Sequence, residues 1–339
     1  MVKKPKGFTL AKKIFMQQIG HYQQVISDYF NTLQVVKDPV NLYEPVKYIL
    51  SLGGKRMRPV LTLMSAEIFN ADCREALPAA VAVEIFHNFS LVHDDIMDDA
   101  PLRRGNETVH EKWNINTGIL SGDAMLIMAY RYFEEYEPET FRSLAKLFSK
   151  TALEVCEGQQ WDVDFEERND VTIPEYLKMI EYKTAVLVAA AMKMGGIVAK
   201  TSVENCDLIY DFGLNLGIAF QLQDDYLDAF GDPATFGKQV GGDIIENKKT
   251  YLYLKALQKA DDTSRKQLTE LFSMQPVDSA EKIELVKNIF TTSGADAETR
   301  KAIEEYTHKA FDTLAQLDIE ENKKAMLRAF GENLMQRKV

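Results

Sequence analysis

Hydrophobic residues recur at helical spacing from about residue 10 to the C-terminus, and the breaks fall where Gly, Pro and Asn cluster. No run of alternating β-branched residues is long enough to require a sheet. The pattern predicts one all-α domain, a helical bundle over residues 1–339. Its helices are expected at 10–31, 40–51, 59–70, 75–98, 117–135, 138–167, 173–194, 203–230, 250–260, 264–273, 279–292, 297–315 and 320–336.

One acidic pattern occurs twice inside these apolar helices, as Asp94-Asp95-Ile96-Met97-Asp98 and as Asp224-Asp225-Tyr226-Leu227-Asp228. Carboxylates are rarely buried unless a cation meets them. Residues four apart share a helix face, so each helix presents a small cluster of carboxylate oxygens. Mg²⁺ is usually held by a few carboxylates together with substrate phosphates and water. The repeat therefore predicts a metal site and a phosphorylated ligand together.

Basic residues lie close to these motifs in the sequence. Gly53-Gly54-Lys55-Arg56-Met57-Arg58 places three cations where glycine lets the backbone approach a ligand, and Arg103-Arg104 follows the first acidic motif. Each could instead be a solvated helix end or a surface salt bridge. Beside two acidic motifs, the phosphate-binding interpretation is favoured.

The segments that follow the two acidic motifs are both expected to be loops. Residues 99–108 contain Pro101 and Gly105, and residues 231–247 contain four glycines and Pro233. We expect two equivalent units without strands, each an acidic helix end followed by a basic or glycine-rich loop. This arrangement predicts a cavity that is closed from one rim.

Composition narrows the class of protein. Apolar residues make up 46% and charged residues 27% of the chain, which fits a soluble helical protein, and the net charge of −11 disfavours nucleic-acid binding. Cys73, Cys156 and Cys206 are isolated, so a disulfide framework or zinc site is not expected, and a cytoplasmic location is. The most apolar window, 185–199, is interrupted by a lysine and a glycine pair, so no membrane span is expected.

Weaker signals lie between the motifs. His87 is two helical turns before Asp94 and shares its face, although a core histidine is the commoner interpretation. Gln221 lies three residues before Asp224, where an ordinary polar helix position is the alternative. The remaining polar positions of this kind are Gly158-Gln159-x-x-Asp162, Lys183-Thr184, Lys238 and Lys248.

The order of these motifs closely resembles that of the trans-isoprenyl diphosphate synthases, also called polyprenyl synthetases. The resemblance covers about residues 45–260. One acidic motif alone is a weak signal, whereas two of them with the basic motifs in family order are highly specific. The matching residues are Gly53-Gly54-Lys55-Arg56, His87, Asp94-Asp95-x-x-Asp98, Arg103-Arg104-Gly105, Gly158-Gln159-x-x-Asp162, Lys183-Thr184, Phe220-Gln221-x-x-Asp224-Asp225-x-x-Asp228, Gly237-Lys238, Gly242-Asp243 and Lys248.

The resemblance implies an all-α bundle around a deep central cavity that works as a homodimer. It also implies electrophilic chain elongation with three Mg²⁺ ions bound to substrate diphosphate. An allylic diphosphate, namely dimethylallyl, geranyl or farnesyl diphosphate, would ionise to an allylic cation. The double bond of isopentenyl diphosphate would then attack the cation, and a proton would be lost.

The resemblance also assigns roles to residues. The principal metal ligands would be Asp94, Asp98 and Asp224, with Asp95, Asp225 and Asp228 acting through water or as supporting groups. Isopentenyl diphosphate would be held by Lys55, Arg58, His87 and Arg104, and Arg56 counts among the substrate-binding residues. The allylic diphosphate would be held by Arg103, Lys183, Thr184, Gln221, Lys238 and Lys248. The catalytic set would be Lys183, Thr184, Gln221, Asp94 and Asp224.

Product length would depend on residues before the first acidic motif. Phe89 lies five residues and Ser90 four residues before Asp94, and an aromatic residue there resembles short-chain members. The first motif also lacks the two-residue insertion typical of many bacterial farnesyl synthases, which favours geranylgeranyl over farnesyl diphosphate as product. If Phe89 is simply part of the core, the floor would lie among Met125, Met128 and Tyr132.

Two other functions remain open. A class I terpene cyclase shares the first acidic motif but usually replaces the second with an Asn/Ser/Glu pattern and does not need the Gly53-Gly54-Lys55-Arg56 motif. A non-catalytic partner subunit of a heteromeric synthase commonly lacks one acidic motif or the basic residues. Both acidic motifs and the basic residues are intact here.

Overall fold

The computed structural model describes residues 6–232, 240–274 and 279–335, with side chains from residue 17 onward. Regular structure in these residues is helical apart from one short hairpin, which confirms the predicted all-α class. The main helices are α1 (Lys6–Thr32), α2 (Val40–Ser51), α3 (Met57–Ile68), α4 (Leu77–Met97), α6 (Ile115–Arg131), α7 (Pro138–Glu167), α8 (Ile173–Ile180), α9 (Val186–Val198), α10 (Val203–Phe230), α13 (Tyr251–Lys259), α14 (Asp262–Leu271), α15 (Ser279–Thr292), α16 (Ala295–Gln316) and α17 (Glu321–Met335).

The chain divides into two compact units. Unit 1 consists of residues 1–149 and 190–207, and unit 2 of residues 150–189 and 208–339. The boundaries fall within α7, α9 and α10. The expectation of a single domain stays a prediction.

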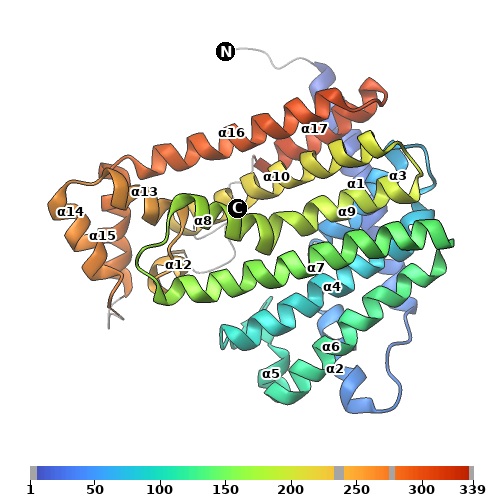
Figure 1. The fold of residues 1–339 in the computed structure, drawn as a ribbon, viewed down its shortest axis with the longest axis horizontal. Coiled ribbons are helices and arrows are strands. Elements are labelled where there is room, and N and C mark those ends of the chain that lie inside the picture. The colour runs from blue at the N-terminus through green and yellow to red at the C-terminus, as the bar shows by residue number, and fades with distance from the viewer. Residues whose placement is uncertain (1–5, 233–239, 275–278, 336–339) are drawn as a thin grey trace. The chain divides into compact units, whose positions relative to one another are not determined.

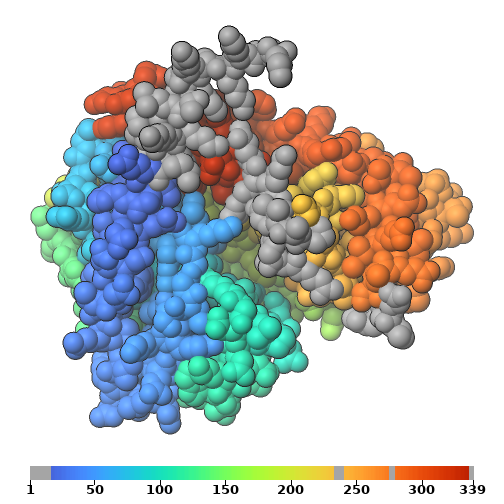
Figure 2. Space-filling view, turned by 180° about the vertical axis from the view of Figure 1, so that it is seen from behind, coloured from blue at the N-terminus to red at the C-terminus, as the bar shows by residue number. Residues whose placement is uncertain are grey.

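Unit 1 is built around α4, which packs along α3 and α6 (Figure 1). Its core includes the fully buried Ile49, Leu63, Phe86 and Phe133. The segment Cys73–Met97 is long and apolar enough to cross a bilayer, with a mean hydropathy of 1.2, but 67% of that window is buried inside the protein. Its apolar character is therefore that of a core helix. Figure 2 shows the surface that α1 and α2, in blue, form on this unit.

Unit 2 has its own core, to which α8, α10, α13 and α15 contribute. Tyr176, Leu222, Leu252 and Phe290 are each at most 1% exposed within it. Helices α13, α14 and α15 lie close together and pack on one another (Figure 1). This core supports the end of α10 that carries the second acidic motif.

The segment after the first acidic motif differs from the strand-free loop expected from sequence. It folds into a hairpin of β1 (Leu102–Arg103) and β2 (Asn106–Glu107), with Arg103 paired to Asn106. Arg104 (φ 56°) and Gly105 (φ 76°) are both left-handed, as a two-residue hairpin turn requires. Strands of two residues have no alternating pattern, so hydrophobic periodicity could not predict them. Short helices α5 (Val109–Lys112) and α12 (Gly242–Ile245) were also missed.

The predicted helix over 173–194 is in fact three segments that continue to Val198. A π-helical turn, η3 (Glu181–Ala185), joins α8 to α9, and α9 passes through Gly195 and Gly196 instead of ending before them. A Cβ atom on Gly195 would lie 2.4 Å from the carbonyl oxygen of Thr62. Gly195 therefore allows α9 to pack closely on α3, and the glycine pair is not a helix break.

Candidate functional site

The first acidic motif ends α4, and its three carboxylates have different environments. Asp95 is completely buried, the Asp94 side chain is 19% exposed and Asp98 is exposed. From the hairpin, Arg103 Nε donates to Asp95 Oδ1 at 2.8 Å, and Arg103 Nη2 lies 3.5 Å from Asp94 Oδ2. Burial raises the pKa of Asp95, although Arg103 opposes the shift. Asp95 therefore holds the hairpin against α4, and the more exposed Asp94 and Asp98 are better placed to bind a metal ion.

A second arginine of the hairpin explains the glycine pair before α3. Arg104 donates to the carbonyl oxygen of Gly53. A Cβ atom on Gly54, whose φ is +126°, would lie 2.9 Å from Arg104 Cζ. A glycine at position 54 thus allows the guanidinium group to lie directly against the backbone.

The guanidinium group of Arg58 is paired with the neutral imidazole of His87. Arg58 Nη1 lies 3.0 Å from His87 Nε2, so the guanidinium donates and the imidazole accepts. Burial, then Arg58 and Arg104, hold the pKa of His87 well below its usual value. Arg58 Nε is buried without a hydrogen-bond partner in the described part of the chain. Crowded guanidinium groups with an unused donor suit an anion such as a diphosphate.

Arg56 and Lys55, which were also predicted to bind diphosphate, lie in different environments from Arg58. Arg56, in a left-handed conformation with φ 48°, makes a buried ion pair with Glu84 and donates to the carbonyl oxygen of Leu50. The guanidinium group of Arg56 therefore contacts Glu84 of α4, and this contact holds the turn before α3 in place. Lys55 is exposed. Their roles in substrate binding stay predictions.

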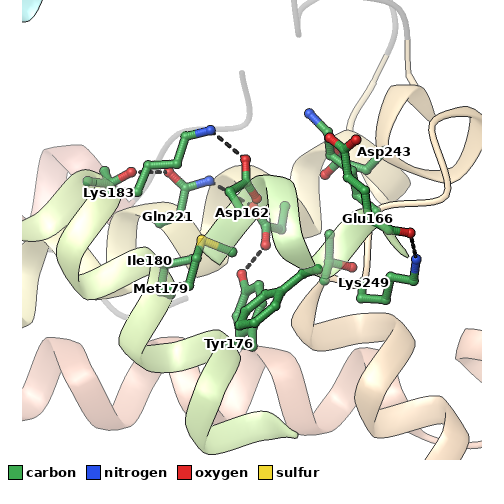
Figure 3. Close-up of a pocket in the computed structure, with 14 residues that line it drawn as sticks. Asp162, Glu166, Tyr176, Met179, Ile180, Lys183, Gln221, Asp243 and Lys249 are labelled. Atoms are coloured by element: carbon green, nitrogen blue, oxygen red, sulfur yellow. Dashed lines mark hydrogen bonds and ion pairs between the residues drawn. The ribbon is translucent and has the colours of Figure 1, made fainter. Parts of the chain in front are cut away.

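The second acidic motif ends α10 in unit 2, beside a cavity of about 120 Å³ (Figure 3). Asp224 is half-buried, whereas Asp225 and Asp228 are buried. The lining residues that matter for chemistry are Asp162, Tyr176, Lys183, Thr184, Gln221, Asp225, Asp243 and Lys248. The structure therefore gathers most of the residues predicted for the allylic diphosphate; Lys238 lies outside the described residues.

Hydrogen bonds order this cavity. Thr184 Oγ1 donates to Gln221 Oε1 at 3.1 Å, and Gln221 Nε2 donates to Asp225 Oδ1 at 2.9 Å. The hydroxyl of Tyr176 donates to the other oxygen of Asp225. Asp228 Oδ2 accepts from the backbone N–H of Asp243 at 3.0 Å, which fixes the start of α12.

Lys183 reaches the cavity because the backbone is irregular there. It lies in the π-helical turn, and its Nζ is 2.5 Å from Asp162 Oδ2 (Figure 3). A Cβ atom on Gly158 would lie 2.3 Å from the backbone nitrogen of Lys183, so only glycine lets α7 approach this turn. π-helical turns of this kind occur frequently at functional sites.

The carboxylates of this cavity are crowded. Burial, Asp224 and Asp228 raise the pKa of Asp225 to about 7, against the hydrogen bonds from Tyr176 and Gln221. Burial, Asp225 and Asp228 raise the pKa of Asp243 well above its usual value. Oxygen ligands in excess at one place are the set that Mg²⁺ prefers, so the residues present fit this ion.

No role was predicted for two residues that line this cavity, Asp243 and Tyr176. Asp243 stands in the Gly242-Asp243 motif, and its position after the second acidic motif was an available signal. Tyr176 gave none, because an aromatic residue at helical spacing is usually core. At the other motif, Phe89 is 8% exposed and its ring centroid is 4.7 Å from that of His93. Ser90 Oγ donates to the carbonyl oxygen of His87.

Comparisons with known proteins show what this chain is similar to. A family model described as Polyprenyl synthetase matches residues 39–289. A geranylfarnesyl diphosphate synthase of Natronomonas pharaonis is 39% identical over 262 residues, 72% of this chain and 77% of that protein. A crystal structure of a geranylgeranyl pyrophosphate synthase is 53% identical, with a TM-score of 0.86 over 98% of this chain and 99% of that chain. A polyprenyl synthase of Caulobacter crescentus, solved with calcium and isoprenyl diphosphate, is 26% identical, with a TM-score of 0.83 over all of both chains.

The low pKa of His87 predicts a pH dependence of stability. The unfolded chain binds a proton at His87 below about pH 6.5, whereas the folded protein does not, so His87 lowers the free energy of unfolding as the pH falls below that value. We expect His87→Gln to flatten the loss of stability between pH 7.5 and pH 5.5, by at most about 1.4 kcal/mol per pH unit. Urea unfolding at several pH values measures this. His308→Gln, at an exposed histidine, is the matched control; equal slopes in wild type and His87→Gln would contradict the prediction.

Proposed function

The chain belongs to the polyprenyl synthetase family of trans-prenyltransferases, and we propose that it condenses isopentenyl diphosphate with an allylic diphosphate to give geranylgeranyl diphosphate. The crowding of buried carboxylates around Asp225 and Asp243 is the observation that carries the proposal. Such crowding is relieved by bound cations, and cations bound there attract a diphosphate. The geranylfarnesyl diphosphate synthase among its relatives shows that product length varies within this similarity.

The chain's own residues divide the work between two clusters. In unit 1, Arg58, Arg104 and neutral His87 hold the diphosphate of isopentenyl diphosphate. In unit 2, Lys183 and Lys248 add positive charge for the allylic diphosphate. When bound at the acidic motifs, Mg²⁺ supplies the charge that stabilises the departing diphosphate.

The chemical step needs no side-chain nucleophile. The carbon–oxygen bond of the allylic substrate breaks, and the electron pair leaves with the diphosphate. The double bond of isopentenyl diphosphate then forms the new carbon–carbon bond, and the released diphosphate takes the proton that is lost. The Thr184 oxygen, held in place by Gln221, steadies the positive carbon.

A class I terpene cyclase is the alternative within this fold. A cyclase has no second diphosphate to hold, and therefore no need for the cluster of Arg58, His87 and Arg104. The close contact of Arg104 with Gly54 and the pairing of Arg58 with His87 favour the synthase. A non-catalytic subunit would not need either charged cluster.

Elongation by the purified chain tests the proposal. With Mg²⁺, labelled isopentenyl diphosphate and each allylic primer in turn, we expect elongated product from the wild type. Asp94→Ala and Asp224→Ala should each lower the rate at least about 100-fold, because charge stabilisation at the leaving group is lost. Asp312→Ala, on the exposed face of α16, is the control and should keep wild-type activity. Full activity in Asp94→Ala with an unchanged circular dichroism spectrum would refute the metal assignment, and no elongation by the wild type would refute the function.

We infer that Phe89 limits product length. Its ring centroid is 5.4 Å from that of Phe86, which packs at 5.0 Å on Phe148, so a buried aromatic cluster holds Phe89 in place. Phe89→Ala removes this bulk about 7.5 Å along α4 from Asp94. We expect a shift to longer products, seen by chromatography after dephosphorylation. Phe141→Ala, at a half-exposed ring on α7, is the control. Unchanged products from Phe89→Ala would contradict the inference and assign the floor that limits the chain to Met125, Met128 and Tyr132 instead.

We infer that the chain forms a homodimer through α6. Ile115, Ile119, Leu120 and Ile127 on this helix are 54%, 41%, 59% and 60% exposed. A second copy would bury this apolar face. We expect sedimentation equilibrium to show a dimer that Ile127→Asp dissociates, whereas Val203→Asp, at an exposed residue outside α6, stays dimeric. A wild-type monomer would contradict the inference.

A further inference from the structure

His110 is a buried histidine whose polar atoms lack partners. It lies on α5, and its side chain is only 4% exposed. Both ring nitrogens are buried without a hydrogen-bond partner in the described part of the chain. A neutral imidazole has one N–H donor and one lone pair. Since no described group donates a hydrogen bond to the ring, the lone pair of His110 is available to a cation.

Two carboxylates lie next to the imidazole. Asp99 Oδ1 is 4.0 Å and Glu111 Oε1 is 3.7 Å from His110 Nε2. One ligand atom from each residue lies within 4.8 Å of the others. Ligand atoms around a tetrahedral ion at about 2.0–2.2 Å are roughly 3.3–3.6 Å apart. Small rotations of the Asp99 and Glu111 side chains, which are 97% and 49% exposed, would reach that spacing.

We propose that Asp99, His110 and Glu111 form a second type of cation site, which takes a divalent transition ion such as Zn²⁺. The donor set decides the class of ion. Mg²⁺ prefers oxygen ligands, whereas an imidazole nitrogen suits zinc, cobalt, nickel and iron. One nitrogen and two oxygens leave a position for water. None of the three residues belongs to the paired acidic motifs, although Asp99 directly follows Asp98.

The site has a structural consequence for the hairpin. Asp99 precedes β1 and His110 follows β2, so an ion held by both closes the segment that carries Arg103 and Arg104. The backbone N–H of Thr108 already donates to the carbonyl oxygen of Pro101 at 3.2 Å within this segment. A bound ion would reduce the freedom of both arginines. The site goes beyond the proposed function, and its test uses no substrate.

Cobalt serves as the probe because Co²⁺ is bound by Zn²⁺ ligands and has visible absorption bands when coordinated. The full chain carrying Asp94→Ala and Asp224→Ala, which weakens binding at the acidic motifs, is titrated with Co²⁺ in the absence of Mg²⁺ and diphosphate. We expect one saturable site, from which Zn²⁺ displaces Co²⁺ and millimolar Mg²⁺ does not.

Substitutions in the same background identify the ligands. Asp99→Asn with Glu111→Gln changes only surface side chains, so the fold is retained, and we expect at least a tenfold weaker affinity for Co²⁺. His110→Gln should remove the saturable site. His308→Gln, at an exposed histidine in unit 2, is the matched control and should bind as the background protein does.

Three results would overturn the proposal. The first is unchanged Co²⁺ affinity in the Asp99→Asn/Glu111→Gln variant, and the second is the lack of a saturable site in the background protein. The third is displacement of Co²⁺ by Mg²⁺ as readily as by Zn²⁺, which would refute the assigned class of ion. Because no primer or isopentenyl diphosphate is present, these results are independent of prenyl transfer.

Discussion

The crowding of like charges at the end of α10 is the constraint on which the functional part of unit 2 depends. Asp225 is buried and near Asp224 and Asp228, so burial and repulsion both raise its pKa. Tyr176 and Gln221 hold its two oxygens by hydrogen bonds but bring no charge. A cation in the cavity would relieve this repulsion, and the hydrogen bonds from Tyr176 and Gln221 hold the Asp225 carboxylate in place.

The local backbone also helps to hold charged and polar groups in position. The π-helical turn presents Lys183 and Thr184 to the cavity, and Gly158 allows α7 to come near enough to support that turn. In unit 1, Gly54 gives Arg104 its place against the backbone, and a left-handed turn at Arg104 and Gly105 brings Arg103 back to α4. These positions are glycine, or adopt unusual backbone angles, because the charged groups must approach the backbone or one another closely.

Sequence patterns predicted the helices and the family better than they predicted the local irregularities of the backbone. Helical periodicity was sufficient for α2, α7, α10 and α15, whose predicted and observed bounds agree. It failed at Gly195, because a glycine that permits packing and a glycine that ends a helix look alike in sequence. The two-residue strands were too short to have a pattern, and the π-helical turn depends on packing against Gly158.

The same limit applies to the candidate site. Repeated acidic motifs in apolar helices identified the carboxylates, since burial of such groups is rare. Tyr176 was not identified, because its aromatic ring is core and only its hydroxyl group contacts Asp225. Arg56 was grouped with the phosphate ligands by its neighbours in sequence, but its partner Glu84 is 28 residues away on another helix. Long-range partners of this kind cannot be read from spacing alone.

The two acidic motifs are alike in sequence and different in electrostatics. Asp95 and Asp225 occupy the same position in each motif, and both are buried and held by neighbouring side chains. Arg103 brings a positive charge to Asp95, whereas Tyr176 and Gln221 bring none to Asp225. A bound cation would therefore stabilise the second motif more than the first, because Asp95 already has a cationic partner in Arg103. The middle aspartate of each motif thus anchors the structure, and the more exposed Asp94, Asp98 and Asp224 are the carboxylates that we expect to meet a metal ion.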